Sequence, residues 1–215
     1  MCIRDRETLI RAELTSRCPG STVIGEEFKD ELGSNGVGWI VDPIDGTVNF
    51  LYDLPVVSVS IAATLDGEVV AGAVTDVLRQ ETFSAASGQG ARLNGQPIST
   101  GNVDGHDNAL IGTGFAYSSQ VRDEQAQTLT RILPRCRDIR CMGSAALNLC
   151  WVGCGRLDAF FERDLKVYDY AAGLLIATEA GAMTEYPRLN SHDMTIASTP
   201  SVFTWLRDEL LSTSN

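Results

Sequence analysis

The stretch "WIVDPIDGTVNF", residues 39–50, carries the strongest structural signal in this chain. An apolar run leads into Asp42 and Asp45, which stand three positions apart with Pro43 between them. Two carboxylates this close repel each other unless a proton or a cation lies between them. Pro43 disfavours a helical conformation at Asp42, so both side chains can face one pocket, with the Ile44 carbonyl as a third oxygen. Such an all-oxygen site suits a hard cation such as Mg²⁺.

The residues after the two aspartates fit a phosphate group. Gly46 allows the backbone to approach a ligand closely. Thr47 opens "TVNFLYD", residues 47–53, which we expect to form a helical turn whose first N–H groups can bind phosphate. A simple surface turn would use the same Asp-Pro and Asp-Gly pairs. The run before them has the composition of a buried strand, so we favour a binding site at the end of a sheet.

Two further acidic residues are candidates for the same site. The sequence "GEEF", residues 25–28, places Glu26 after a short strand and a glycine. If that strand lies beside the strand that ends at Asp42, Glu26 joins the carboxylate cluster. Asp169, in "KVYDYAAG" (166–173), stands at the start of an apolar helix, where aspartate is also a favoured N-cap. The two roles are compatible.

Composition limits the classes of partner. The 215 residues include 17 basic and 28 acidic side chains, a net charge of −11. Such a surface repels nucleic acid and anionic membranes, and the sequence has no run of Lys or Arg to offset it. No apolar stretch reaches the roughly 18–20 residues that a membrane span needs. The start, "MCIRDRETLI", has no apolar core of a signal peptide. We therefore expect a cytoplasmic protein without a nucleic-acid or membrane partner.

The cysteines are scattered and form no C-x-x-C pair. We interpret them as buried thiols in a reducing compartment and not as a disulfide framework. The two histidines are too few for a histidine-rich zinc site. The cysteines are Cys2, Cys18, Cys136, Cys141, Cys150 and Cys154, and the histidines are His106 and His192.

The order of expected elements predicts two lobes, residues 1–105 and 106–215. A helix at 7–18, with Ile10, Leu14 and Cys18 on its buried face, precedes strands that are largely antiparallel. Asp66-Gly67 and Asn94-Gly95 are hairpin turns in this half. The second half alternates helix and strand, which favours helices and sheets in layers. Expected strands are 21–25, 38–42, 56–65, 69–78, 81–86, 91–98, 156–162 and 194–198, and later helices are 118–133, 143–153, 169–181 and 201–211.

Two other phosphatase motifs are present only in part. Residues 150–156, "CWVGCGR", fit the C-x-x-G-x-x-R spacing of cysteine phosphatases. Leu149 and Leu157 replace the flanking His and Ser/Thr of that motif, and an apolar helix does not lower the pKa of a thiol. The sequence "IDGT" resembles haloacid dehalogenase-type phosphatases, but Pro43 stands where their nucleophilic Asp lies. Both readings fail.

Five stretches, in order, resemble the inositol monophosphatase family. The match covers residues 7–215 and implies a layered α/β/α/β/α sandwich of the inositol monophosphatase and fructose-1,6-bisphosphatase type. The family has further N-terminal helices, which we expect to be truncated here. The matching stretches are "GEE" (25–27), "WIVDPIDGTVNF" (39–50), "GSAALNL" (143–149), "RLDAFFE" (156–162) and "YDYAAG" (168–173).

The resemblance also implies roles for individual residues. It implies Mg²⁺-dependent hydrolysis of a phosphate monoester with two or three ions, a homodimer, and sensitivity to Li⁺. Metal ligands are expected at Glu26, Asp42, the Ile44 carbonyl, Asp45 and Asp169. Gly46 and Thr47 would bind phosphate, and Gly143, Ser144, Ala145, Glu162 and Asp169 would contact the alcohol part of the substrate. The catalytic residues would be Glu26, Asp42 and Thr47, with Asp42 between two ions and the others orienting and deprotonating the attacking water.

The substrate is less sharply defined than the chemistry. The family's adenosine 3′,5′-bisphosphate phosphatases tend to read "DGTKEF" where this chain has "DGTVNF", residues 45–50. The Asn-Phe form resembles the inositol-phosphate branch, which implies conversion of inositol 1-phosphate to myo-inositol and phosphate. Fructose 1,6-bisphosphate, histidinol phosphate and adenosine 3′,5′-bisphosphate are alternatives. A non-catalytic, regulatory interaction protein on the same fold is the alternative of another class.

Overall fold

The computed structural model describes residues 3–186 and 193–212, so Cys2 and His192 lie outside the described residues. Within these ranges, six α-helices and two short 3₁₀-helices follow one another. The α-helices are α1 (Ile3–Arg17), α2 (Thr47–Leu51), α3 (Ser119–Ile132), α4 (Ala145–Gly153), α5 (Val167–Glu179) and α6 (Pro200–Leu211), and the 3₁₀-helices are His106–Asn108 and Leu133–Arg135.

The strands form two sheets. The larger has the order β1-β2-β3-β4-β5-β6-β7 and is antiparallel except for the parallel pair β1 and β2. The smaller has the order β11-β12-β10-β8-β9. The bounds are β1 (Thr22–Gly25), β2 (Val37–Asp45), β3 (Ser58–Leu65), β4 (Glu68–Asp76), β5 (Glu81–Ala86), β6 (Ala91–Leu93), β7 (Gln96–Ile98), β8 (Leu110–Thr113), β9 (Asp138–Cys141), β10 (Ala159–Arg163), β11 (Met183–Glu185) and β12 (Met194–Ser198).

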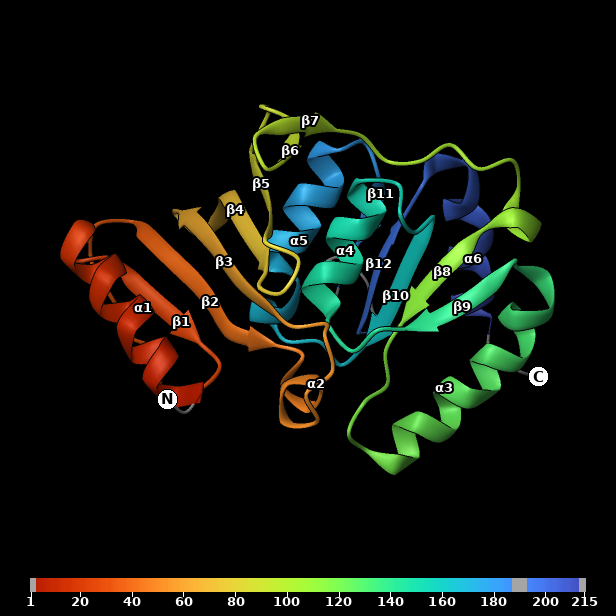
Figure 1. Ribbon diagram of the computed structural model, residues 1–215, viewed down its shortest axis with the longest axis horizontal. Helices are drawn as coiled ribbons and strands as arrows, with labels where there is room; N and C mark the ends of the chain where they lie inside the picture. Colours follow the sequence, from red (N-terminus) through yellow and green to blue (C-terminus); the bar gives the residue numbers. More distant parts are fainter. Residues whose placement is uncertain (1–2, 187–192, 213–215) are drawn as a thin grey trace.

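These elements lie in five layers. Figure 1 shows them from left to right as α1, the larger sheet, α4 with α5, the smaller sheet, and α3 with α6. One apolar core surrounds α4 and α5 between the sheets, and a second lies between the smaller sheet and α3 with α6. This order of helix and sheet layers confirms the predicted α/β/α/β/α sandwich.

Local turn chemistry fixes the larger sheet. Asp66 and Gly67 have φ of 50° and 88°, and Asn94 and Gly95 have φ of 48° and 80°. Two successive positive φ values match the twist of antiparallel strands, which is why Asp-Gly and Asn-Gly favour tight hairpins. Both predicted hairpins, β3–β4 and β6–β7, are therefore confirmed.

Several predicted boundaries and faces were wrong. β2 does not end at Asp42 but continues to Asp45, with a shift of its register against β3 between the two aspartates. Three strands, β8, β9 and β11, were not predicted, since each has only three or four residues. The helix α1 does not bury Ile10, Leu14 and Cys18, which are only half-buried. Its buried residues are Glu7 and Arg11.

The described cysteines are all free thiols, as expected. Cys150 is fully buried in the core around α4. Cys141, at the end of β9, is exposed, so its predicted burial was wrong, because β9 is the last strand of its sheet. None of the helices in the described part of the chain combines the length and apolarity that crossing a membrane requires.

Candidate active site

The strand pair β1–β2 brings Glu26 and Asp42 together. The two strands run parallel with Gly25 opposite Val41, so the next residues, Glu26 and Asp42, follow the last pair of this ladder at the same end. Burial first, and then the charge of Glu27, raises the pKa of Glu26, whereas a hydrogen-bonding interaction with Asp42 acts to lower it. The sequence left open whether the strands are neighbours, and the register shows that they are.

The carboxyl group of Asp42 is strongly perturbed by its surroundings. Its side chain is buried, and Oδ1 accepts a hydrogen bond from the Ile44 N–H at 2.9 Å. Burial, followed by the charges of Asp45, Glu26 and Asp169, raises its pKa to about 10. At neutral pH and without a cation, Asp42 therefore holds a proton.

Asp45 joins the end of β2 to the start of α4. Its Oδ2 accepts hydrogen bonds from Ser144 Oγ at 2.5 Å and from the Ala146 N–H at 2.9 Å. The Ala145 N–H and Ser58 Oγ, each at 3.2 Å, complete the set. These donors favour the charged form, yet complete burial still raises the pKa of Asp45.

Asp169 and Glu162 close the cluster from the second half of the chain. The helix α5 begins at Val167, so Asp169 is the third helical residue and not the N-cap that its sequence position suggested. Its Oδ2 accepts a hydrogen bond from the Lys166 N–H at 2.6 Å. Burial, and then the charges of Asp45 and Glu26, raises its pKa to about 7. Burial, and then Asp45 and Asp169, raises the pKa of Glu162 on β10 to about 8.

The segment expected to bind phosphate adopts the expected turn. Gly46 has φ of 94°, and a Cβ there would lie 2.8 Å from the Val56 carbonyl oxygen, so only glycine fits. The helix α2 starts at Thr47, whose Oγ1 donates to the Ile44 carbonyl oxygen at 3.1 Å. A Cβ on Gly46 would also lie 3.1 Å from the Gly143 carbonyl oxygen. The predicted phosphate segment and the start of the α4 segment are therefore adjacent.

Sequence reasoning missed two polar residues that support the site. Asn49 on α2 donates through Nδ2 to the carbonyl oxygens of Val56, at 2.9 Å, and Met142, at 2.7 Å. Ser58 on β3 is fully buried and donates to Asp45. Asparagine inside an apolar turn was a usable signal, because a buried amide needs partners. A serine in an alternating strand gives no comparable signal.

The donor set fits a hard divalent cation. The cluster offers carboxyl oxygens and the Ile44 carbonyl, and burial together with the neighbouring carboxyl groups raises the pKa values of its acidic side chains. Within residues 3–186 and 193–212, however, no three His, Cys, Asp or Glu side chains already converge as metal ligands. Like charges move apart when no cation holds them, so ion binding requires these side chains to approach one another.

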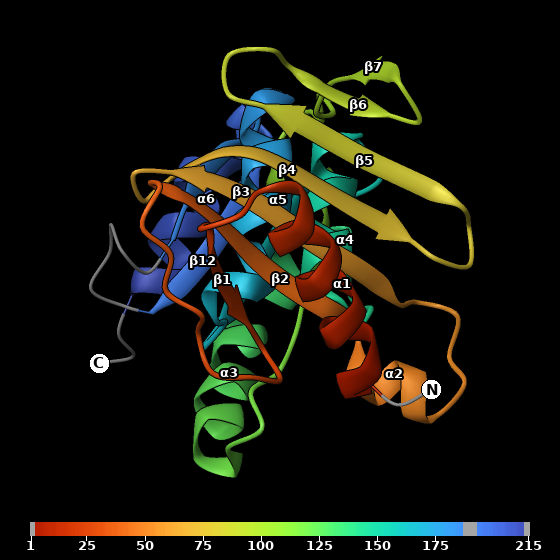
Figure 2. The ribbon, with the colours of Figure 1, turned by 90° about the vertical axis from the view of Figure 1, so that its left-hand side faces the viewer.

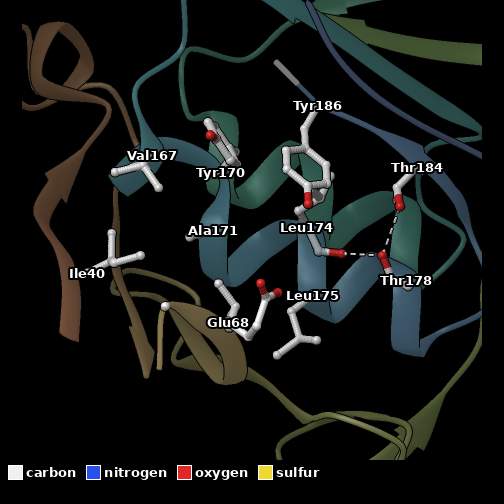
Figure 3. Close-up of a pocket in the computed structure, with 12 residues that line it drawn as sticks. Ile40, Glu68, Val167, Tyr170, Ala171, Leu174, Leu175, Thr178, Thr184 and Tyr186 are labelled. Carbon is white, nitrogen blue, oxygen red and sulfur yellow. Dashed lines mark hydrogen bonds between the residues drawn. The ribbon is translucent and has the colours of Figure 1, made fainter. Parts of the chain in front are cut away.

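A separate hollow lies away from the carboxylate cluster. It has a volume of about 260 Å³ and lies beside α5, between β11 and the β3–β4 turn. Figure 3 shows Tyr170 and Tyr186 on one side of it and Glu68 and Leu175 on another. None of its lining residues belongs to the carboxylate cluster. We therefore identify the candidate active site from the positions and charges of its acidic side chains, and not from this hollow.

The predicted substrate-contacting residues come from two places, the stretch 143–145 and the pair Glu162 and Asp169. Ser144 and Ala145 are buried, and their polar atoms bond to Asp45. Gly143 has φ of 79° and lies against Asn49, which would block a Cβ. Glu162 and Asp169 face the cluster itself. All five therefore lie beside the aspartates, and their contacts with a substrate stay a prediction.

Comparisons with known proteins agree on one family. A family model described as "Inositol monophosphatase family" matches residues 3–207. The "Inositol-1-monophosphatase SuhB" of Mycobacterium tuberculosis is 43% identical over 220 residues, covering 97% of this chain and 74% of that protein. The "Nus factor SuhB" of Escherichia coli is 37% identical over 179 residues, covering 82% of this chain and 67% of that protein.

Solved structures show the same fold. The structure of Mycobacterium tuberculosis SuhB has a TM-score of 0.87 and 44% identity, covering 96% of this chain and 82% of that chain. A Thermotoga maritima IMPase has a TM-score of 0.87 and 32% identity, covering 96% and 80%. The carboxylate cluster described above therefore lies in a fold shared with proteins that carry these names.

Proposed function

Because this chain belongs to the inositol monophosphatase family, we propose that it hydrolyses small phosphate monoesters with Mg²⁺ and that inositol 1-phosphate is its substrate. The observation that carries the proposal is the cluster of acidic side chains with raised pKa values at the shared edge of β1 and β2. The acidic residues of this cluster are Glu26, Asp42, Asp45, Glu162 and Asp169.

Glu26, Asp42, the Ile44 carbonyl, Asp45 and Asp169 would hold two or three ions. When bound, Mg²⁺ would neutralise the phosphate dianion and make a water molecule acidic enough to attack phosphorus. The charges of Asp45, Glu26 and Asp169 all act on Asp42, which supports its assignment as the shared ligand. The Asp45 carboxyl group is already oriented by Ser144, and the Asp169 carboxyl group by the Lys166 N–H.

Thr47 and Glu26 are suited to handle the attacking water. A hydroxyl group has one proton and two lone pairs. The Thr47 proton is directed at the Ile44 carbonyl, so the lone pairs of Oγ1 can accept a hydrogen bond from water. Burial keeps the pKa of Glu26 above its usual value, which favours proton uptake by this carboxylate. The backbone of Gly46 and Thr47 would bind the phosphate oxygens.

Glu162, with Gly143, Ser144, Ala145 and Asp169, would surround the alcohol part of the substrate. A carboxyl group whose pKa is about 8 is mostly protonated at neutral pH and can donate a hydrogen bond to a hydroxyl oxygen. When ionised it accepts from hydroxyl groups instead. This versatility suits a polyol such as inositol, which presents both donors and acceptors.

Steady-state assays of phosphate release test the proposal. The purified chain is assayed with inositol 1-phosphate, fructose 1,6-bisphosphate, histidinol phosphate and adenosine 3′,5′-bisphosphate, each with Mg²⁺ and with EDTA. The proposal predicts the highest kcat/KM for inositol 1-phosphate and no turnover in EDTA. Phosphate release that persists in EDTA contradicts the metal-dependent chemistry, whereas preference for another ester contradicts only the substrate.

A second candidate function is regulatory. Relatives named Nus factor SuhB support it, since they share the family but carry the name of a regulatory factor. Complete absence of phosphate release from a folded, Mg²⁺-binding chain would favour this candidate. We further propose that the chain folds as two lobes, residues 1–105 and 106–215, that it forms a homodimer, and that Li⁺ inhibits it. Gel filtration with light scattering tests the dimer, and initial rates in LiCl against KCl test the Li⁺ effect.

A further inference from the structure

The helix α1 carries a buried ion pair on the face that meets the larger sheet. Glu7 is completely buried and Arg11 is 6% exposed. Arg11 Nε donates to Glu7 Oε1 at 2.7 Å. Figure 2 shows α1 lying in front of β1 and β2. A helix usually turns apolar residues toward a sheet, so a charged pair there calls for a specific explanation.

The ion pair holds the segment that contains Glu26. The second oxygen of Glu7, Oε2, accepts the Glu27 N–H at 2.8 Å. Arg11 donates to the carbonyl oxygens of Val23, at 3.3 Å, and Phe28, at 3.5 Å. The pair thus bonds to backbone groups on both sides of Glu26.

Close packing fixes the same segment. A Cβ on Gly25 would lie 2.2 Å from Glu7 Oε1, so the backbone at this glycine rests directly on the carboxylate. Two residues further on, Arg4 Nε pairs with Glu27 Oε2 at 3.4 Å. The side chain of Glu27 is therefore held toward α1, while that of Glu26 interacts with Asp42.

From these contacts we propose that Glu7 is a positioning residue for Glu26, with Arg11 as its fixed counter-ion. The inference rests on the proposed function, because only there is Glu26 a metal ligand. Glu26 lies among like charges, including Asp45 and Glu27, which drive its segment away from the cluster. The Glu7 carboxylate opposes that movement by holding the neighbouring N–H group.

The charge of Glu7 explains why Arg11 is needed. An unpaired carboxylate here would be costly to bury and would add to the repulsion on Glu26. With Arg11 attached, Glu7 keeps a strong acceptor for the Glu27 N–H. A purely structural role would be served equally by two apolar side chains, since replacing a buried ion pair in this way is often neutral or stabilising.

The test compares two ion pairs of the same spacing on the same helix. Glu13 and Arg17 form an i,i+4 pair at 2.6 Å, but the side chains of both are exposed. Glu7→Gln and the matched control Glu13→Gln are prepared in the full chain. Mg²⁺ affinity is measured by calorimetry, amide exchange at residues 24–28 is measured in the metal-free chain, and Tm is recorded for each.

Glu7→Gln should raise the Mg²⁺ Kd by roughly 10- to 100-fold, as loss of a group that orients a ligand does. It should also accelerate exchange of the Glu27 amide, while Glu13→Gln changes neither. Should Glu7→Gln fold poorly, the variant Glu7→Leu/Arg11→Leu restores apolar packing without the acceptor. A double variant with parental Tm, parental Mg²⁺ affinity and a protected Glu27 amide would overturn the inference.

A double-mutant cycle separates action through Glu26 from a general effect. In a Glu26→Gln background, adding Glu7→Gln should weaken Mg²⁺ binding no further, because the ligand it positions is already gone. Fully additive effects would overturn the inference. A parent chain that binds no Mg²⁺ contradicts the proposed function itself, whereas a parent that binds Mg²⁺ with Glu7→Gln indistinguishable from Glu13→Gln contradicts only the role of Glu7.

Discussion

Ser144 Oγ donates to Asp45 Oδ2 at 2.5 Å and joins two parts of the chain that are 99 residues apart. Ser144 Oγ also accepts a hydrogen bond from the Leu147 N–H at 3.3 Å and so caps α4. One hydroxyl group thus fixes both a helix start and a candidate metal ligand. Stability and function should therefore respond together when it is removed.

Ser144→Ala should lower the free energy of unfolding by roughly 1–3 kcal/mol, because a cap and a buried hydrogen bond are lost together. It should also reduce kcat/KM, since Asp45 loses its shortest hydrogen bond. Urea denaturation and phosphate release measure the two effects. The control is Ser118→Ala at the N-cap of α3, where the serine is exposed and its side chain makes no capping bond. Equal destabilisation by both variants would contradict the capping role of Ser144.

Asp42→Asn should lower kcat by at least roughly 100-fold and leave the fold intact. The amide oxygen can still accept the Ile44 N–H, but the negative charge is lost. In EDTA at pH 8 the variant should be as stable as the parent or more stable, because the parent buries a carboxyl group whose charge is disfavoured. Asp66→Asn is the matched control, since it removes an exposed charge from a turn that Asn-Gly suits equally well. A kcat near that of the parent would remove Asp42 from the site.

The metal-free chain should lose stability as pH rises. Asp169, Glu162 and Asp42 have pKa values of about 7, 8 and 10 in the folded chain, against about 4 when unfolded. At a pH between the unfolded and the folded pKa of a group, the folded chain holds more protons than the unfolded chain. The free energy of unfolding therefore falls as pH rises, by about 1.4 kcal/mol per pH unit for each retained proton. The stability contributed by these three protonated carboxyl groups is complete below pH ~4 and is lost as pH rises through about 7 to 10.

Mg²⁺ should reverse this dependence. Metal ions bind the deprotonated carboxylates, so stabilisation by Mg²⁺ grows with pH and binding releases protons. Urea denaturation at pH 5, 7 and 9, with EDTA or with Mg²⁺, measures both slopes. Stability in EDTA that rises from pH 5 to pH 9 would show that these carboxyl groups are not protonated in the folded chain.

Local patterns predicted local structure well. Asp66-Gly67 requires two positive φ values, and the sequence chemistry of the turn alone identifies the β3–β4 hairpin. The bond between Ser144 and Asp45 depends on how the two halves pack, which no short window contains. Only the family resemblance placed both residues in one site.

The polar contacts of α1 show another limit. Apolar periodicity assigned its buried face to Ile10, Leu14 and Cys18, whereas the structure buries Glu7 and Arg11. Period arguments count apolar residues and cannot anticipate an ion pair that meets backbone groups of a distant loop. Such exceptions are expected near functional residues, where local rules yield to the requirements of the site.

Cys150→Ala should leave kcat within about twofold of the parent and cost roughly 1 kcal/mol of stability, since the thiol only fills space in the core. Burial raises the pKa of Cys150 well above its ordinary value, so no thiolate is available at neutral pH. Arg156→Lys should also preserve turnover, because the two terminal nitrogens of the Arg156 guanidinium group donate to Glu81, at 2.5 and 2.6 Å. Loss of turnover in both folded variants would revive the cysteine-phosphatase reading.

Thr47→Ala should lower kcat by on the order of 100-fold while changing the Mg²⁺ Kd much less. The hydroxyl is assigned to the attacking water, whereas the carboxylates hold the ions. Its bond to the Ile44 carbonyl fixes the direction in which the lone pairs point, so the role depends on the oxygen and not on the methyl group. Thr47→Ser keeps that oxygen and should retain most of kcat. Calorimetry and steady-state rates separate binding from turnover. If Thr47→Ala and Thr47→Ser lose kcat equally, packing of the methyl group explains the effect, and the hydroxyl has no part in the reaction.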